Sequence, residues 1–492
     1  MLVSCEEMRR LEEAAFARGI RAGDLMEEAA RGIAQIVRQF HPVPGQCIAY
    51  CGKGNNAGDA LVALKFLKEW GWDVSVSLAF KAEDFSELPA AHYQSLQPAS
   101  FGGMAGRGRP LVVLDGLLGS GAKGEPRDPI AGEIAAINRL RREHAAWVLA
   151  IDLPSGLQGD TGEPASHCVE ADLTATIGYA KLGLVRDTAT NFVGRLALIP
   201  LEDLEQPTAI HPGKISTSVE LAPWLPPRSY DQHKGNFGRV GIIAGSPGYL
   251  GAARMCSAAA VKAGGGLVTL YVKAETQMAF ATACIPEVMV KVLKNYRDIL
   301  DENLDVIAIG PGLGTDSVSE VTAIVQRAKQ PMVVDADALN IVARDITLLK
   351  YCAGPRLLTP HPGEMERLLP QRSNTRREWL EDFIAKYPVT LLLKGARTVI
   401  GWPEGERYYN PTGNPGMGSG GMGDVLTGVC AALIGQLGAD GMSKAAVLGA
   451  WLCGRAAERA IFAGSESPES LCAEDIISHL GGAFSDLRRQ VY

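Results

Sequence analysis

The sequence predicts two three-layer α/β/α domains, each built on a mostly parallel sheet with helices on both faces. Apolar, strand-like segments alternate with helical or glycine-rich segments in both halves, and a segment rich in Pro, Glu and Ser interrupts them near the middle. A chain of 492 residues, 47% hydrophobic and 21% charged, suits a soluble globular protein of more than one domain. We therefore predict domains at 1–205 and 229–492, joined by a linker at 206–228.

The first half is predicted to contain two helices followed by six buried strands. Within residues 4–39, apolar residues recur at intervals of three and four, first as Met8, Leu11 and Ala15 and then between Leu25 and Val37. Short apolar runs predict strands at 46–51, 73–80, 111–115, 146–152, 173–178 and 195–200. This alternation is typical of a doubly wound sheet.

The second half repeats the alternation after the interruption. Residues 201–227 include PWLPP at 223–227, which suits a linker better than a helix or strand. A helix of small residues is predicted at 251–263, and strands are predicted at 239–245, 267–272, 305–310, 331–335, 356–360 and 389–395. We expect one α/β domain here.

Composition excludes several classes of protein. The net charge of −7 and the lack of a Lys/Arg block argue against binding to nucleic acid or to an anionic membrane. The ten cysteines are scattered, without the paired spacing of zinc sites, and read as reduced core residues. With no apolar signal core and no run of 18 apolar residues, we expect a cytoplasmic protein.

The glycine run at 413–428, GNPGMGSGGMGDVLTG, is the strongest chemical signal. Such glycines leave a row of backbone N–H groups unshielded before a helix, where they can hold a phosphate, and Asp424 stands where a base can reach a neighbouring hydroxyl. The alternative is a mobile connection, but the apolar, helix-forming run that follows favours an anion site.

Polar and glycine-rich loops also follow three strands of the first half. Residues 52–60, GKGNNAGDA, offer side-chain oxygens from Asn55, Asn56 and Asp59, while Asp115 and Asp152 each end an apolar strand. Either aspartate alone is more often a helix cap. Because ligands bind at the carboxyl ends of strands in open α/β sheets, three such loops predict a site.

Together, GKGNNAGDA (52–60), DGLLGSG (115–121) and DLPSGL (152–157) resemble the YjeF N-terminal family, which includes NAD(P)H-hydrate epimerases. The resemblance covers residues 1–205 and implies a Rossmann-like domain. It implies that Asn56, Asp115 and Ser155 hold K⁺ and that Asp152 is the acid/base. The implied contacts with the hydrated nucleotide are Asn55, Asn56, Ala57, Gly58, Asp59, Gly119, Ser120, Gly121, Ala122, Lys123, Gly124 and Asp152.

The chemistry of hydrated NADH agrees with this resemblance. Its C6 hydroxyl lies beside N1, so a carboxyl group that supplies a proton lets water leave, and water can return on the other face. The sequence has Ala57 and Ala60 where the family commonly has glycine, and a positive φ at Ala57 would cost about 1 kcal/mol. A binding module without catalysis is the alternative.

The second half resembles the ADP-dependent NAD(P)H-hydrate dehydratase family, which implies a ribokinase-like fold. The matching motifs are HKGNFG (233–238), AGSPGYLGAA (244–253), GPGLG (310–314), DADALN (335–340), LTPHPGEMERLL (358–369), LLLKGART (391–398) and the glycine run. The implied contacts with the hydrated nucleotide are Ala252, Gly314, His361 and Asp424. Those implied for ADP are Lys394, Gly395, Ala396, Arg397, Thr398 and Gly423.

By this resemblance, Asp424 is the base that activates the C6 hydroxyl for attack on the β-phosphate of ADP in the presence of Mg²⁺. AMP is released, and the phosphorylated ring then eliminates phosphate to restore NADH or NADPH. The glycine amides stabilise the charge on the transferring group. Met422 stands where the family commonly has Thr, so a weaker grip on ADP is expected.

Two other functions fit parts of the same pattern. A ribokinase-like small-molecule kinase uses a similar glycine motif with ATP, and its product would be ADP. A regulatory nucleotide-binding protein would keep ligand binding without a reaction. The HPGE and KGART motifs favour the dehydratase, acting on NADHX and NADPHX, and the resemblance implies a homo-oligomer.

Overall fold

The computed structural model describes residues 1–96, 99–100, 108–122, 124–208, 211, 213–370, 373 and 375–492. The chain divides into two compact units, one of residues 1–215 with Tyr492 and one of residues 216–491. The predicted linker, 206–228, contains β10 (Lys214–Ile215) and α7 (Ser218–Leu221). Among the described helices, none is long and apolar enough to span a bilayer.

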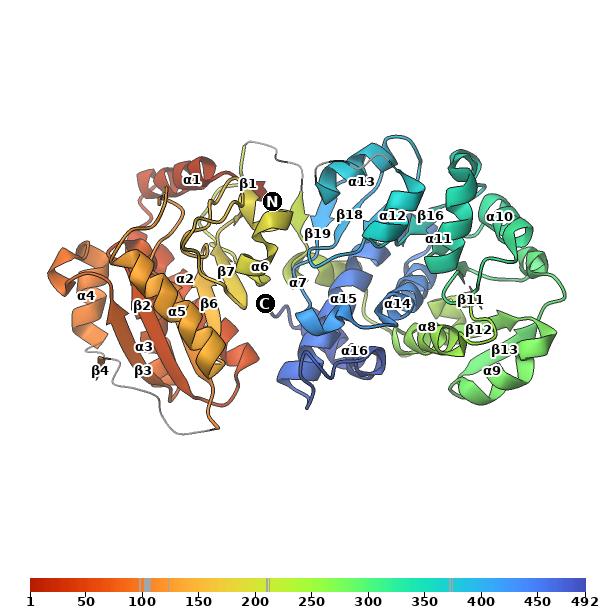
Figure 1. The fold of residues 1–492 in the computed structure, drawn as a ribbon, viewed down its shortest axis with the longest axis horizontal. Helices are drawn as coiled ribbons and strands as arrows, with labels where there is room; N and C mark the ends of the chain where they lie inside the picture. Colours follow the sequence, from red (N-terminus) through yellow and green to blue (C-terminus); the bar gives the residue numbers. More distant parts are fainter. Residues whose placement is uncertain are drawn as a thin grey trace. The chain divides into compact units, whose positions relative to one another are not determined.

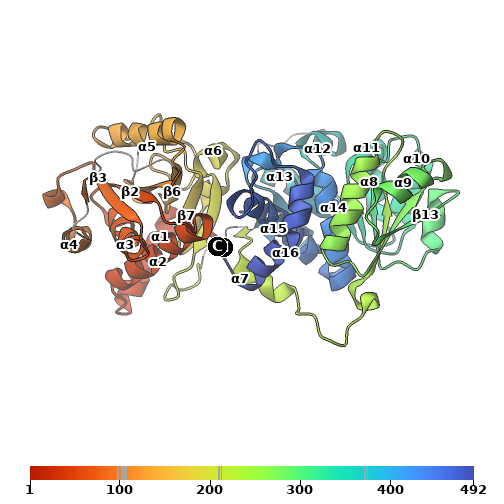
Figure 2. The same ribbon diagram turned by 90° about the horizontal axis from the view of Figure 1, so that it is seen from below.

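The N-terminal unit is a parallel sheet between two layers of helices. In spatial order its strands are β4 (Ala99–Ser100), β3 (Asp73–Leu78), β2 (Gln46–Cys51), β5 (Leu111–Gly116), β6 (Trp147–Ile151), β7 (Leu173–Ile177) and β9 (Arg195–Ile199). Its helices are α1 (Cys5–Ala17), α2 (Ala22–Phe40), α3 (Asn55–Glu69), α4 (Glu87–Leu96), α5 (Ile130–His144) and α6 (Thr190–Val193). Figure 2 shows α5 on one face of the sheet and α2 and α3 on the other.

A second, two-stranded parallel pair joins the N-terminus to the segment after β7. In it, β1 (Leu2–Val3) pairs with β8 (Ala180–Lys181), with Val3 opposite Lys181. All six strands predicted in this half are present, with ends that differ by at most two residues. The two-residue strands were not predicted, because two residues carry no periodicity.

The C-terminal unit is built on a larger, mixed sheet. In spatial order its strands are β19 (Arg407–Tyr409), β18 (Val399–Gly401), β17 (Thr390–Leu393), β16 (Arg356–Leu358), β15 (Met332–Val334), β14 (Val306–Ile309), β11 (Arg239–Ile243), β12 (Leu267–Val272) and β13 (Val288–Val292). The pairs β17/β18 and β18/β19 are antiparallel, and the others are parallel.

Helices cover both faces of this sheet, as Figure 1 shows. Besides α7, they are α8 (Leu250–Lys262), α9 (Gln277–Ala283), α10 (Val318–Arg327), α11 (Ala336–Val342), α12 (Pro362–Leu368), α13 (Arg376–Ile384), α14 (Met422–Leu437), α15 (Met442–Phe462) and α16 (Ala473–Arg488). The six predicted strands and the predicted helix are present within two residues. The prediction of two three-layer α/β/α domains is confirmed.

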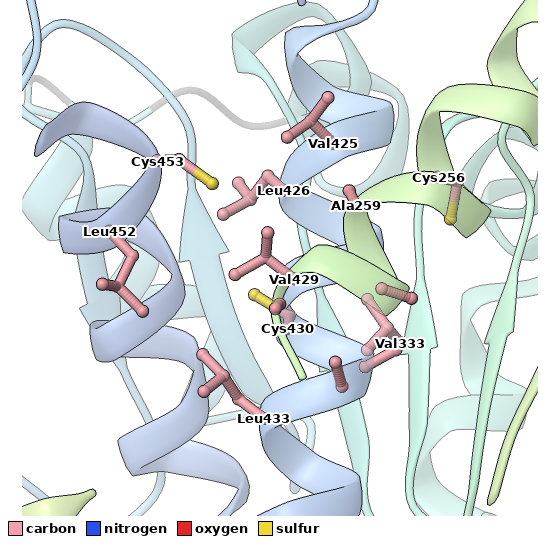
Figure 3. Packing of buried hydrophobic residues seen from close by; sticks show 14 of the residues in the cluster. Cys256, Ala259, Val333, Val425, Leu426, Val429, Cys430, Leu433, Leu452 and Cys453 are labelled. Atoms are coloured by element: carbon pink, nitrogen blue, oxygen red, sulfur yellow. The ribbon is translucent and has the colours of Figure 1, made fainter. Parts of the chain in front are cut away.

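Helix α14 forms the centre of the C-terminal core. Its residues from Val425 to Ile434 are all buried, and they pack between α8 and α15 (Figure 3). Small residues permit the close approach, since a Cβ added to Gly428 would lie 2.0 Å from the Cys256 backbone oxygen of α8. The helix that carries Asp424 is thus fixed by packing on both sides.

We expect Gly428→Ala to destabilise the C-terminal unit. The added methyl overlaps the α8 backbone, which cannot move as a side chain would, and overpacking of this kind costs about 1–3 kcal/mol or more. Gly435→Ala is the matched control in the same helix, because its Cβ would come no closer than 3.4 Å to Gly238. Thermal unfolding should show a lower Tm for Gly428→Ala only; equal Tm values would contradict this packing.

Candidate active sites

The polar loops of the N-terminal unit lie at the point where the strand order of its sheet reverses. Strands β2 and β5 are neighbours, but the chain continues from β2 to β3 on one side and from β5 to β6 on the other. The loops after β2 and β5 therefore diverge, and this is the usual ligand position in an open α/β sheet. The loop after β6, which begins with Asp152, joins them.

The three predicted K⁺ ligands are linked by one hydrogen-bond network. Asn56 Nδ2, in the first turn of α3, donates to the backbone oxygens of Leu118 at 2.9 Å and Ile151 at 3.1 Å. Ser155 donates to Asp115 through Oγ at 2.6 Å and through its backbone N–H at 2.8 Å. The backbone N–H of Leu118 donates to Ser155 Oγ at 2.9 Å. The structure therefore brings Asn56, Asp115 and Ser155 to one place.

The Asp115 carboxyl group is fully buried, and burial raises its pKa to about 6, against the lowering effect of its hydrogen bonds from Ser155 and Leu117. No Lys or Arg among the described residues forms an ion pair with it. A buried carboxylate beside amide and hydroxyl oxygens is a donor set that suits a hard cation. Among the described residues, no cluster of three or more His, Cys, Asp or Glu is arranged to hold a metal.

Asp152 adopts a left-handed backbone conformation, with φ of 64°, directly after β6. Its carboxylate forms an ion pair with Lys181 and accepts the backbone N–H of Ile177 at 3.2 Å. Lys181 is 1% exposed and also donates to the Ile177 backbone oxygen at 2.9 Å. Strain held in place by a buried ion pair is a feature of functional sites, and it distinguishes Asp152 from a helix cap.

Lys181 was missed by the sequence reasoning. The signal was a single lysine in the otherwise apolar segment IGYAKLGL (177–184), directly after a predicted strand. A buried lysine needs an acidic partner, and a search among the strand-end aspartates leads to Asp152. Glu12 of α1 was also missed; burial raises its pKa, with Lys181 opposing and Asp152 adding to the effect.

Asp59 differs from Asp152 in its surroundings. It is buried one turn into α3, and its side chain makes no hydrogen bond with any described residue. Burial raises its pKa well above the usual value, Asp152 and Glu12 add to the rise, and Lys181 opposes it. The two carboxyl groups thus lie in different surroundings: Asp152 is paired with Lys181, whereas Asp59 has no ion-pair partner among the described residues.

The remaining predicted residues of this site lie on α3 and on the loop after β5. Ala57 is fully buried in helical conformation without a positive φ, so its methyl group causes no backbone strain. Gly58 packs against Met26, and Asn55 is exposed at the start of the helix. Gly119 and Ser120 are partly exposed, Gly121, Ala122 and Gly124 are exposed, and Lys123 lies outside the described residues.

In the C-terminal unit, Asp424 lies in the first turn of α14, directly after the glycine run. Gly421, with φ of 89°, makes the turn into the helix. Burial raises the pKa of Asp424 to about 7; Asp335 adds to the rise and Lys394 opposes it. A carboxyl group poised near neutral pH suits general acid–base chemistry.

Lys394 lies among acidic side chains beside Asp424. Its Nζ is 2.9 Å from Asp335 Oδ1 and 3.7 Å from Glu364 Oε2. Burial alone would lower its pKa, but Asp335 and Glu364 raise it overall, so the lysine stays charged. Thr427 Oγ1 donates to Asp335 Oδ2 at 2.8 Å, and a Cβ on Gly423 would lie 3.2 Å from Lys394 Nζ. Lys394 therefore lies close to Gly423, the residue before Asp424. Asp335 links Lys394 to α14 through Thr427.

His361 caps its own helix. The ring nitrogen Nδ1 of His361 accepts hydrogen bonds from the backbone N–H of Gly363 at 3.0 Å and from that of Glu364 at 3.3 Å. The backbone N–H of His361 donates to Glu364 Oε2 at 2.8 Å. His361 is thus the N-cap of α12. The other ring nitrogen, Nε2, lies 3.5 Å from Glu364 Oε1, and the side chain is 51% exposed.

The other predicted contacts surround this centre. Gly395 and Thr398 form a turn in which Thr398 Oγ1 donates to the Gly395 oxygen at 3.0 Å, with Ala396 between them and Arg397 buried. The N–H of Gly314 donates to Asp337 Oδ2 at 2.8 Å. Ala252, at the start of α8, lies beside the loop of Gly312. These last two loops follow β11 and β14, where this sheet changes direction.

Comparison with known proteins finds similarity along both halves. Residues 22–183 match the model of the family described as YjeF-related protein N-terminus, and residues 240–478 match that of NAD(P)H-hydrate dehydratase. Both ranges agree with the resemblances inferred from the motifs.

Whole proteins are similar over nearly their full length. A bifunctional NAD(P)H-hydrate repair enzyme from Moorella thermoacetica is 37% identical, covering 100% of this chain and 98% of that protein. One from Coxiella burnetii is 34% identical, covering 98% of each. Among solved structures, an ADP/ATP-dependent NAD(P)H-hydrate dehydratase from Bacillus subtilis, co-crystallized with ATP/Mg²⁺, is 27% identical, covers 57% of this chain and 100% of that chain, and has a TM-score of 0.49.

Proposed function

This chain belongs to the family of bifunctional NAD(P)H-hydrate repair enzymes, and we propose that it restores hydrated NADH and NADPH through two activities. The N-terminal unit interconverts the R and S epimers at C6, and the ribokinase-like C-terminal unit dehydrates the S form while converting ADP to AMP and phosphate. The similarity to bifunctional relatives along the whole chain carries this proposal. A dehydratase specific for one epimer leaves the other unrepaired unless an epimerase accompanies it.

In the dehydratase, Asp424 takes the proton of the C6 hydroxyl. Its raised pKa makes it an effective base near neutral pH. The amides at the end of the glycine run, residues 418–423, and the start of α14 would face the charge that develops on the transferring phosphoryl group, and Lys394 adds a positive charge. Mg²⁺ would come with the nucleotide, whose phosphates are its usual ligands. Phosphorylation then turns a poor leaving group into a good one.

In the epimerase, two carboxyl groups divide the proton transfers. Asp59 holds the proton that the departing hydroxyl needs, and Asp152 with Lys181 takes the proton of the water that returns. Asn56, Asp115 and Ser155 would hold K⁺, which would supply positive charge to the buried Asp115 and order the loops around the nucleotide.

The dehydratase rate should rise with pH and level off above about 7, because only the ionised form of Asp424 is a base. Below that pH, kcat/KM should fall roughly tenfold per pH unit. The measurement is a series of initial rates over this range with saturating nucleotide, and the epimerase assayed in the same buffers is the control. A rate independent of pH across the neutral range would contradict the role of Asp424.

Nucleotide products separate this proposal from a kinase. Incubation with hydrated NADH and ADP should yield AMP, phosphate and NADH in equal amounts. The kinase alternative instead predicts ADP from ATP and a phosphorylated product that accumulates.

The expected homo-oligomer is tested by the molar mass that light scattering gives for the purified protein at several concentrations.

A further inference from the structure

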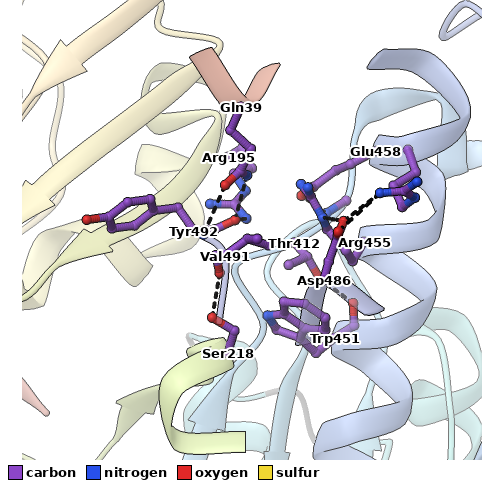
Figure 4. Close-up of polar contacts among 12 residues, drawn as sticks. Gln39, Arg195, Ser218, Thr412, Trp451, Arg455, Glu458, Asp486, Val491 and Tyr492 are labelled. Carbon is purple, nitrogen blue, oxygen red and sulfur yellow. Dashed lines mark hydrogen bonds and ion pairs between the residues drawn. The ribbon is translucent and has the colours of Figure 1, made fainter. Parts of the chain in front are cut away.

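The segment that enters the glycine run is fastened to helix α15 by buried polar contacts. Asn410 Nδ2 donates to the Ala450 oxygen at 3.2 Å, and Thr412 Oγ1 donates to the Trp451 oxygen at 3.0 Å. The N–H of Gly413, the first residue of the run, donates to Glu458 Oε1 at 2.9 Å. The Glu458 side chain is 1% exposed. Figure 4 shows Glu458 beside Arg455 and Asp486, and the contact between Thr412 and Trp451.

Glu458 belongs to a buried ion network that links α15 to α16. Its Oε2 is 2.8 Å from Arg455 Nη1, and Arg455 Nε is 2.9 Å from Asp486 Oδ2. Arg459 also pairs with Asp486, at 3.0 Å. Burying such charges costs desolvation energy that their attraction only partly returns, so stability alone is a weak reason for the network. The contact between Arg455 and Glu458 has another effect: it fixes the carboxylate whose other oxygen accepts the Gly413 N–H.

The glycine run depends on such external contacts. Gly413 has φ of 118°, and the next residues turn through a 3₁₀ segment at Pro415–Gly418, where Asn414 Oδ1 accepts the Gly416 N–H at 3.0 Å. A glycine-rich segment has few side chains to hold it. Its far end is fixed where Thr427 bonds Asp335, and its near end is fixed at Glu458.

We propose that Glu458, held in place by Arg455, is a positioning residue that sets the phosphate-binding amides of the glycine run for dehydration. The role rests on the proposed function, because it acts on the loop that holds the transferring phosphoryl group. Donors that are placed before the reaction need no reorganisation during it, and a misplacement of about 1 Å can cost about 10²-fold in rate.

The test compares three variants in the full chain. Glu458→Met removes the acceptor for Gly413 and is expected to lower kcat for ADP-dependent dehydration by about 10²-fold. Glu458→Gln keeps an oxygen acceptor and is expected to recover most of that rate. Asp486→Asn weakens the same ion network without touching Gly413, so it should lower Tm while kcat stays close to that of the wild type. All rates are measured well below the lowest Tm.

The outcomes separate positioning from stability. A Glu458→Met rate equal to wild type, or a loss of rate that Asp486→Asn matches, would overturn the proposal. If Glu458→Met does not fold, Thr412→Val serves instead: it removes the contact with Trp451 and should lower kcat in the same direction, and an unchanged kcat overturns the proposal. Wild-type protein that shows no ADP-dependent dehydration would instead overturn the proposed function itself.

Discussion

Asp424→Asn is expected to lose ADP-dependent dehydration by a factor of about 10²–10⁴, the usual effect of removing a general base. Asparagine keeps the size of the side chain but cannot accept the proton of the C6 hydroxyl. Interconversion of the epimers depends on the other unit and should continue at the wild-type rate, which provides the control in the same sample. A variant that still forms AMP and NADH at a comparable rate would contradict the assignment.

The same substitution should stabilise the C-terminal unit at neutral and alkaline pH. The folded-state pKa of Asp424 is raised from 3.8 to about 7. Because the folded-state pKa is the higher of the two, the contribution of Asp424 to stability is fully present below the unfolded-state pKa. It is lost as the pH rises through the folded-state pKa. The Tm of Asp424→Asn should therefore exceed that of the wild type by an amount that grows up to about pH 7 and then stays constant. A constant difference at every pH would contradict the raised pKa.

Lys181→Met is expected to abolish epimerisation and to destabilise the N-terminal unit. The change leaves the Asp152 carboxylate buried without its cation, and breaking a buried pair in this way typically costs about 3–5 kcal/mol. The epimerase should lose about 10²-fold or more in rate, as judged by chromatography of the epimers without ADP. Dehydration of the S form should persist, because it belongs to the other unit.

A double variant separates the two effects of Lys181. Lys181→Met with Asp152→Asn removes both charges, so it should recover much of the lost stability while the epimerase stays inactive. Recovery of activity with stability would show that the pair is only structural. Full activity in Lys181→Met alone would show that Asp152 needs no cationic partner.

Sequence periodicity was sufficient for the buried parallel strands, because each is a continuous apolar run between glycine or polar residues. Strand β13, at one edge of its sheet, was not predicted. Its residues Val288 and Met289 alternate between buried and exposed positions, and such a short amphipathic run is easily read as a loop. The short antiparallel strands β18 and β19 were missed for the same reason of length.

Site residues were predictable where they all lie in one short segment of the chain, as Asp424 does in the glycine run. They were not predictable where a residue's contact partner comes from a distant segment. Lys181 and Glu12 meet Asp152 only through folding, and Asp335 joins Lys394 to Thr427 across three elements. The sequence reasoning also considered backbone strain at Ala57. Ala57 has no positive φ, and the positive φ in this site occurs at Asp152.

The central claim is that one chain repairs both epimers, and the most direct test is recovery of NADH from an equal mixture of hydrated NADH epimers. Protein, ADP, Mg²⁺ and K⁺ are added, and the absorbance of the reduced nicotinamide ring is followed. The account predicts recovery of essentially all the NADH, faster than spontaneous epimerisation allows. A fast phase that stops near one half would contradict an active N-terminal unit, and no ADP-dependent recovery would contradict the repair function altogether.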